Sequence, residues 1–147
     1  MTPSEKAEKI AKTLMFKHDA FSHWLGIEIL HVGPGSCTVR SEVRYEMMNG
    51  FNICHGGITF SIADSAFAFA SNSHGIHAVS IETSISHTKS VHTGDIITAT
   101  AVEKNLTTKL GIYEVIVTNQ HEAVVAIFKG TVFRTGKEWD IDSGVHL

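Results

Sequence analysis

The sequence predicts an α+β protein in which a curved antiparallel sheet of five or six strands wraps around one long central helix. Residues 54–73 are apolar on every side of a helix, as in a helix that is covered all round. Two segments before this helix have a strand-like pattern, and four segments after it are rich in Val, Ile, Thr and Phe and separated by turn residues. The chain has 147 residues, 43% of them hydrophobic, so we expect a single domain over residues 1–147.

Residues 1–20 form the first expected element, an N-terminal helix region. Its apolar residues Ala7, Ile10, Ala11 and Leu14 follow the spacing of one helical face, and charged residues occupy the other positions. The helix should therefore lie on an apolar surface. Because these charges leave no uninterrupted apolar run, the segment is neither a secretory signal nor a membrane span, and we expect a cytoplasmic protein that does not bind membranes.

The strands follow in order along the chain. Residues 25–32 and 36–45 read as an antiparallel pair joined by a Gly-Pro-Gly turn, and a loop with an Asn-Gly turn follows at 46–52. After the central helix, whose end is marked by Gly75, short links predict antiparallel neighbours. These later strands are expected at residues 78–87, 95–104, 111–119 and 123–134, followed by a loosely held tail at 135–147.

Composition excludes several function classes. The chain has 12 basic and 15 acidic residues, a formal net charge of -3, and no clustered basic stretch, which argues against nucleic acid as a partner. Cys37 and Cys54 show no close pairing motif, so reduced, packed thiols are expected. His74 and His77 flank the helix-ending glycine without an adjacent carboxylate, so no metal site is predicted.

Asp64 is the anomaly of the central helix. It is the only permanently charged residue between His55 and Gly75. Desolvating a carboxylate costs several kcal/mol, so a buried Asp is expected either to be paired structurally or to be needed chemically.

A second unusual feature, His55-Gly56-Gly57, opens the same helix. Paired glycines are poor helix formers, but they let a ligand approach the first N–H groups, which have no acceptor within the helix. Such a site suits a polarised carbonyl oxygen or a developing oxyanion. Combined with Asp64 two turns later, the glycines favour a catalytic site over simple close packing.

The spacing of these two features predicts a dimer. Eight positions on one helix correspond to about 12 Å, whereas a carbonyl activator and an attacking group must both lie within about 3.5 Å of one reacting centre. Two antiparallel copies of the helix, related by a twofold axis, bring Gly56 of one subunit beside Asp64 of the other. We therefore expect a homodimer with two active sites at its interface.

With these residues in view, the chain resembles the hotdog-fold thioesterases. The matching residues, which lie between about Phe21 and Arg134, are Asn49, His55-Gly56-Gly57, Asp64 and Gly94-Asp95. Cys54-His55-Gly56-Gly57 with Ala63-Asp64-Ser65 is most similar to the phenylacetate-pathway acyl-CoA thioesterases. The resemblance implies an enzyme, a hydrolase acting on thioesters such as (hydroxy)phenylacetyl-CoA or another aryl or medium-chain acyl-CoA, and a homotetramer built from hotdog dimers.

The resemblance also implies roles for individual residues. The Gly56 N–H polarises the thioester carbonyl, Asn49 orients the thioester or the attacking water, and His55 belongs to the same motif. Asp64 acts as general base or as a nucleophile that forms an anhydride, and the sequence leaves both open. The substrate-binding candidates are Gly57, Ser80, Thr83 and Ser84, together with Lys89, Lys104, Lys109 and Arg134 for the coenzyme A phosphates. No cofactor is expected beyond the coenzyme A of the substrate.

Two other functions remain as alternatives. A hotdog hydratase or dehydratase also acts on acyl thioesters, but its histidine pattern differs from His55-Gly56-Gly57. A non-catalytic acyl-CoA-binding module on the same fold would not need Asp64.

Overall fold

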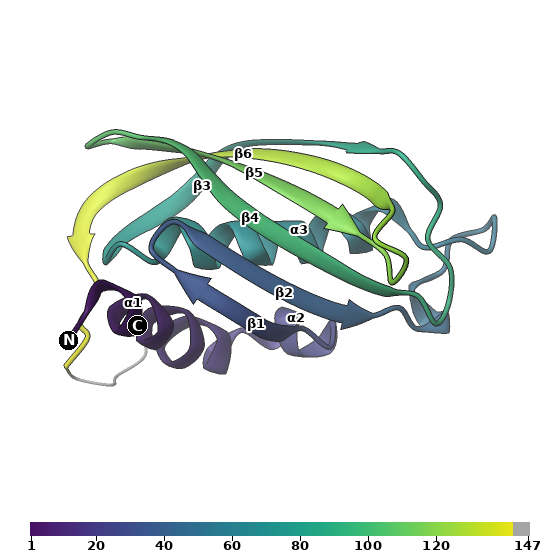
Figure 1. Cartoon of the computed structure of the whole chain (residues 1–147), viewed down its shortest axis with the longest axis horizontal. Coiled ribbons are helices and arrows are strands. Elements are labelled where there is room, and N and C mark those ends of the chain that lie inside the picture. The colour runs from purple at the N-terminus through teal and green to yellow at the C-terminus, as the bar shows by residue number, and fades with distance from the viewer. Residues whose placement is uncertain (143–147) are drawn as a thin grey trace.

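The computed structural model describes residues 1–142, which form one six-stranded antiparallel sheet curved around a central helix, α3 (Figure 1). The strands lie in the order β1-β2-β4-β5-β6-β3. The strands are β1 (Glu28–Gly33), β2 (Ser36–Glu42), β3 (Ile76–His87), β4 (Ile96–Leu106), β5 (Leu110–Thr118) and β6 (Val124–Glu138), and the helices are α1 (Pro3–Glu8), α2 (Ala20–Trp24) and α3 (Gly56–Asn72). The predicted fold class is confirmed.

The core lies between α3 and the concave face of the sheet. Phe67 packs against Tyr113 and Phe128, with ring centroids 5.9 and 5.5 Å apart. Gly130 lies beneath this ring, and a Cβ there would be 2.6 Å from the Phe67 Cζ atom. A strand glycine is therefore needed so that the helix can pack this closely on β6.

The N-terminal region lies beside β1 and against α3 (Figure 1). Thr2 caps α1 through a capping box with Glu5, and the helical backbone continues in π geometry through Met15. The predicted apolar face is confirmed, because Ala7, Ile10, Ala11 and Leu14 are all buried.

Helix α3 is not covered on all sides within one protomer. Gly57 is exposed and Ser61, Asp64 and Ala68 are only half-buried, whereas the residues between them are mostly buried. Their spacing of four, three and four residues puts them on one face of the helix, which we call the open stripe. Asp64 lies on this stripe.

The expectation of a loose tail from residue 135 is wrong for residues 135–138. Strand β6 continues to Glu138, which pairs with Ile76 of β3. Trp139 then donates from its backbone N to Gly75 O at 2.9 Å and from Nε1 to Asn72 Oδ1 at 3.0 Å. The last predicted tail residues, 143–147, lie outside the described residues.

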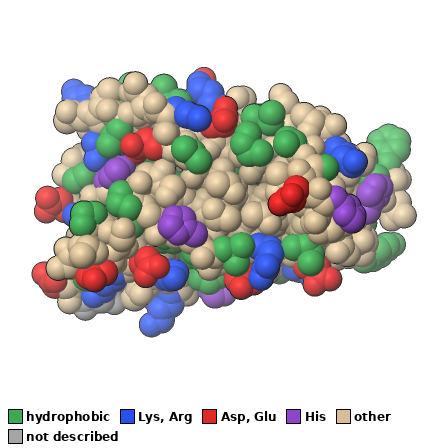
Figure 2. Space-filling view, viewed as in Figure 1, with side chains coloured by type: hydrophobic (Ala, Val, Ile, Leu, Met, Phe, Trp, Pro, Cys, Tyr) green, Lys and Arg blue, Asp and Glu red, His purple; other side chains and the backbone are tan. Residues whose placement is uncertain are grey.

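On the face shown in Figure 2, acidic and basic side chains are interspersed. No helix within residues 1–142 is both long and apolar enough to cross a membrane.

Candidate active site

The first turn of α3 has one free backbone donor. His55 precedes the helix with extended backbone angles, and its Nδ1 accepts a hydrogen bond from Gly57 N at 2.9 Å. The His55 carbonyl accepts from Ile58 N at 2.9 Å. The Gly56 N–H has no partner among the described residues. His55 thus braces the helix start and occupies the Gly57 amide, which leaves Gly56 as the available donor.

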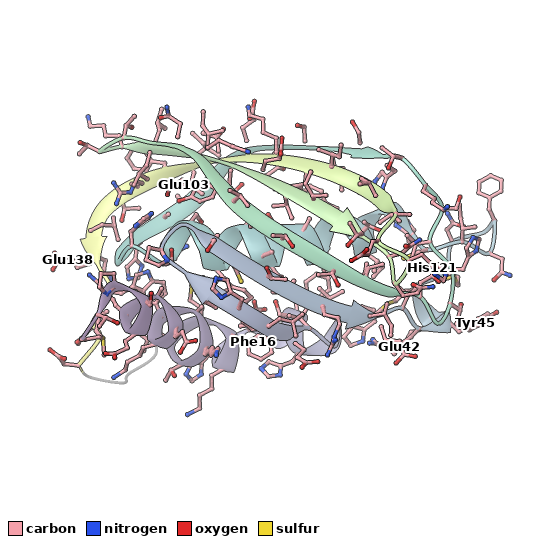
Figure 3. All side chains as sticks on the ribbon, viewed as in Figure 1. Phe16, Glu42, Tyr45, Glu103, His121 and Glu138 are labelled. Atoms are coloured by element: carbon pink, nitrogen blue, oxygen red, sulfur yellow. The ribbon has the colours of Figure 1, made fainter. Side chains whose placement is uncertain are left out.

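The loop before α3 carries Asn49. Its Oδ1 accepts hydrogen bonds from Phe51 N at 2.9 Å and Ile53 N at 3.3 Å, which closes the turn. Its Nδ2 group makes no hydrogen bond within residues 1–142 and can donate to a ligand. Figure 3 labels Tyr45, just upstream, at the opposite end of the molecule from Glu138.

A cavity of about 380 Å³ opens at this end of α3. Three segments line it: the Asn49 loop, the first turn of α3 and the chain that follows β3. Its lining residues are Asn49, Ile53, Cys54, Gly56, Thr59, His87, Thr88, Lys89, Ser90 and Val91.

The wall that follows β3 is held in place by hydrogen bonds. Cys54 N donates to Val91 O at 2.7 Å, which ties this wall to the loop before α3. The carboxylate of Asp95 accepts from His92 N at 2.9 Å and from Gln120 Nε2 at 2.8 Å. The cavity therefore has a preorganised shape.

Asp64 carries a carboxyl group without a hydrogen bond or ion pair to any described residue. Burial raises its pKa above the usual value, and the negative charge of Asp19 raises it further. Asp19 belongs to the N-terminus of α2, where it accepts a hydrogen bond from Ser22 Oγ at 2.5 Å. Ser22 Oγ in turn lies 2.8 Å from the Ser65 hydroxyl, beside Asp64 in sequence. A carboxylate with a raised pKa is a stronger base near neutral pH.

Within one protomer, Asp64 does not line the cavity at Gly56. The two residues are eight positions apart on the continuous helix α3, a rise of about 12 Å. One protomer therefore contains both chemical groups but does not bring them to one reacting centre.

The cysteines do not supply a nucleophile. Burial raises the pKa of the Cys54 thiol, although Cys54 borders the cavity, and it raises the pKa of Cys37 to about 12. Both thiols stay protonated near neutral pH. Residues 1–142 contain no cluster of three or more His, Cys, Asp or Glu that could hold a metal ion.

The other sequence-predicted residues are distributed over the molecule. Ser80, Thr83 and Ser84 lie on β3, opposite Val132, Gly130 and Lys129 of β6, and are absent from the cavity lining. Lys89 lines the cavity. Lys109 lies in the turn between β4 and β5, at the far end of α3, where its carbonyl accepts from Arg134 N at 2.7 Å. Lys104 is on β4 and contacts Glu114 at 3.9 Å.

Sequence reasoning missed four polar residues of the cavity lining, Thr59, His87, Thr88 and Ser90. Thr59 is 3% exposed and lies one helical turn after Gly56, so helical spacing could have identified it. His87 ends β3 and meets Gly56 only through the tertiary contact between this strand and α3.

Comparison with known proteins then identifies the family. Residues 51–126, just over half of the chain and including the loop, α3 and the cavity wall, match the model of the thioesterase superfamily. The chain belongs to the thioesterase superfamily. A protein of Archaeoglobus fulgidus is 40% identical over 136 residues, 92% of this chain and 88% of its own length. The acyl-coenzyme A thioesterase PaaI of Escherichia coli is 38% identical over 83% of this chain and 87% of its own.

Solved thioesterase structures agree with this membership. The structure of the E. coli PaaI protein from the phenylacetic acid degradation operon superposes with a TM-score of 0.90 at 37% identity, covering 93% of this chain and 99% of its own. A Streptococcus mutans protein bound to acetyl CoA gives a TM-score of 0.75 at 29% identity, over 77% of this chain and 91% of its own. The resemblance to hotdog-fold thioesterases of the phenylacetate-pathway type is confirmed, and this superfamily member is a thioester hydrolase.

Proposed function

We propose that the protein hydrolyses acyl-CoA thioesters at sites shared between two protomers. One observation supports this most strongly: the unpaired Gly56 N–H faces a cavity at the start of α3, while the unpaired carboxyl group of Asp64 lies on the open stripe of the same helix. Together they supply an electrophile activator and a base, the two groups that acyl transfer to water requires.

The chemistry follows from these groups. The Gly56 N–H polarises the thioester carbonyl, assisted by the positive end of the α3 dipole, and Asn49 Nδ2 orients the thioester or the water. Asp64 takes a proton from water as its oxygen adds to the carbonyl carbon, or adds itself to give an anhydride that water then cleaves. In both routes the C–S bond breaks, coenzyme A leaves as a thiolate, and the proton that water loses remains to neutralise it.

The protomer has surfaces that suit the dimer this chemistry needs. Strand β3 is at one edge of the sheet and pairs only with β6 within the described residues. Val79 and Ile81 on it are 51% and 58% exposed, which is unusual for apolar residues on an open edge. A second copy pairing along β3 by a twofold axis joins two sheets and turns each open stripe toward its neighbour.

In the expected tetramer, the two dimers contact each other through the outer face of the sheet. Leu110, Ile127 and Phe133 on the outer side of β5 and β6 are about 40% exposed (41%, 41% and 40%). Apolar groups spread over one sheet face are typical of an interface between subunits.

Among acyl groups we propose an aryl-acetyl ester such as (hydroxy)phenylacetyl-CoA, handled in the cytoplasm. The support for this substrate is the E. coli relative, which comes from a phenylacetic acid degradation operon.

A thiol-release assay tests the proposal. Aryl-acetyl, medium-chain and long-chain acyl-CoA esters are each mixed with the wild type, with Asp64→Asn and with Glu28→Gln. Glu28→Gln is the control, because it removes an exposed carboxylate of β1 that does not line the cavity. We expect Asp64→Asn to lose at least about a hundredfold in turnover, as for removal of a general base, and the control to match the wild type. Thiol release by none of the esters, or full activity in Asp64→Asn, would contradict the proposal.

A further inference from the structure

The imidazole of His87 lies directly over the first residue of α3. A Cβ atom built on Gly56 would lie 3.1 Å from His87 Nε2, 3.4 Å from Cε1 and 3.8 Å from Cδ2. The order of these distances means that the Nε2 edge of the ring faces Gly56. His87 is the last residue of β3, its side chain is exposed, and it lines the same cavity as Asn49 and Gly56.

Nothing in residues 1–142 uses the polar atoms of this ring. His87 makes no hydrogen bond, ion pair or ring contact with any described residue. His55, by contrast, has its Nδ1 committed to the Gly57 amide. The imidazole beside the cavity is therefore available to a ligand, and the imidazole of the family motif is largely occupied.

One ligand atom can reach both Gly56 and His87. Covalent geometry puts Cβ about 2.5 Å from the nitrogen of the same residue. With Nε2 3.1 Å from that Cβ position, the two nitrogens are at most about 5.6 Å apart. Two N–H···O hydrogen bonds of about 2.9 Å span up to about 5.8 Å. A single oxygen can therefore accept from the Gly56 N–H and from His87 Nε2–H together.

We infer that His87 is a catalytic residue of this enzyme, the second hydrogen-bond donor to the thioester carbonyl oxygen beside the Gly56 amide. This inference rests on the proposed thioesterase function and adds a residue to its site. As water adds to the carbonyl carbon, negative charge develops on that oxygen, and Nε2–H donates to it without transferring its proton. When the C–S bond breaks and the carbonyl re-forms, the imidazole is unchanged.

The inference also explains why position 56 is glycine. A Cβ at this position would lie 3.1 Å from His87 Nε2, so a side chain there would push the ring away from the Gly56 amide. The amide N–H alone would survive such a substitution, but the two-donor site would not.

Kinetics of three variants test this role. His87→Phe keeps a ring without a donor, and His87→Gln restores an N–H donor. His92→Phe is the control, because His92 is an exposed histidine in the chain that follows β3 and does not line the cavity. Loss of one oxyanion donor lowers kcat on the order of a hundredfold. We expect that loss in His87→Phe with little change in KM, partial recovery in His87→Gln, and wild-type kinetics in His92→Phe.

Infrared spectroscopy supplies a readout that does not depend on turnover. In Asp64→Asn the bound thioester is hydrolysed slowly enough for its carbonyl stretch to be recorded. Adding His87→Phe should move this band to higher frequency, because the carbonyl is less polarised, and adding His92→Phe should leave it in place. An unshifted band, or a wild-type kcat in His87→Phe while Asp64→Asn is inactive, overturns the role of His87 and leaves the proposed function standing. Absence of thiol release by the wild type overturns the proposed function itself.

Discussion

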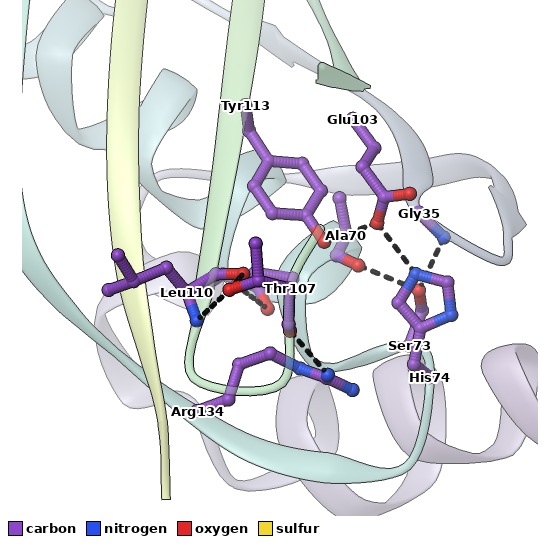
Figure 4. Close-up of polar contacts among 11 residues, drawn as sticks. Gly35, Ala70, Ser73, His74, Glu103, Thr107, Leu110, Tyr113 and Arg134 are labelled. Atoms are coloured by element: carbon purple, nitrogen blue, oxygen red, sulfur yellow. Dashed lines mark hydrogen bonds and ion pairs between the residues drawn. The ribbon is translucent and has the colours of Figure 1, made fainter. Parts of the chain in front are cut away.

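The two ends of α3 differ in whether their polar groups have hydrogen-bond partners. At its start, the Gly56 N–H and the His87 imidazole have no partner among the described residues, and both border a cavity. At its end, hydrogen bonds link Ser73 and His74 to neighbouring residues (Figure 4). Ser73 Oγ donates to Ala70 O at 2.6 Å and accepts from Gly35 N at 2.7 Å.

The C-terminal end of α3, which we call the closed end, also has a hydrogen-bond network around the Glu103 carboxylate. Glu103 Oε1 lies 2.7 Å from His74 Nε2 and accepts from the Tyr113 hydroxyl at 2.8 Å. Burial first, and then the hydrogen bond to Glu103, raises the pKa of Tyr113, so its hydroxyl stays protonated as a donor. Helix α3 therefore serves two purposes. Its C-terminal end anchors the fold, and its N-terminal end keeps donors free for a ligand.

The largest effect on stability is expected at the closed end, from Asn72→Ala. Asn72 is 3% exposed; its Oδ1 accepts from Ala78 N at 2.9 Å and from Trp139 Nε1, and its Nδ2 donates to Ala68 O at 3.0 Å. Removing it leaves the Ala78 N–H and the Trp139 Nε1–H without their hydrogen-bond acceptor, at about 2–3 kcal/mol of unfolding free energy. Urea unfolding measures the loss. Turnover per folded molecule should not change, and a selective loss of turnover would break the distinction between the two ends.

At the open stripe, Asp64→Asn should raise the free energy of unfolding at neutral pH while it lowers turnover at least about a hundredfold. A raised carboxyl pKa means that the folded state holds its proton more tightly than the unfolded state, so ionisation costs folding free energy as pH rises above the ordinary value of 3.8. The gain in unfolding free energy should therefore be present at pH 7 and vanish below pH 3.8. Urea unfolding at both pH values checks this, and an equal gain at both would contradict the assigned cause.

The smallest expected effect is a change in KM, and it compares two lysines at opposite ends of α3. Lys89 lines the cavity, whereas Lys109 lies in the remote turn between β4 and β5. Lys89→Gln should raise KM for acyl-CoA by about two- to fivefold, with kcat unchanged, because one exposed charge attracts the phosphates weakly. Lys109→Gln should leave KM unchanged. Steady-state kinetics at low and high salt measure both, and the effect of Lys89 should fade at high salt.

Local patterns were sufficient to predict most of the fold. Residues 111–117 alternate between buried and half-buried positions in β5, as the sequence predicts. The continuation of β6 to Glu138 was not predictable locally, because it depends on pairing with Ile76, 62 positions earlier in the sequence.

The candidate site was predictable where one residue was anomalous by itself. Asp64 was a lone charge in an apolar helix, and Gly56 was a glycine where a helix starts. His87 carries no such signal. It lies beside Gly56 only in the folded chain, and the β3 register has irregularities between Ile76 and Ala78 and between Ser80 and Glu82 that no local pattern encodes.

Mixed oligomers test the central claim, that each site joins the Gly56 end of one protomer to Asp64 of another. Asn49→Ala and Asp64→Asn, each expected to lose most of the activity alone, are unfolded together and refolded as an equal mixture. If the sites are shared, half of the dimers are mixed and each carries one intact site, so activity should return to about one quarter of the wild-type value. If both groups act within one chain, no intact site can form, and a mixture as inactive as its components would contradict the account.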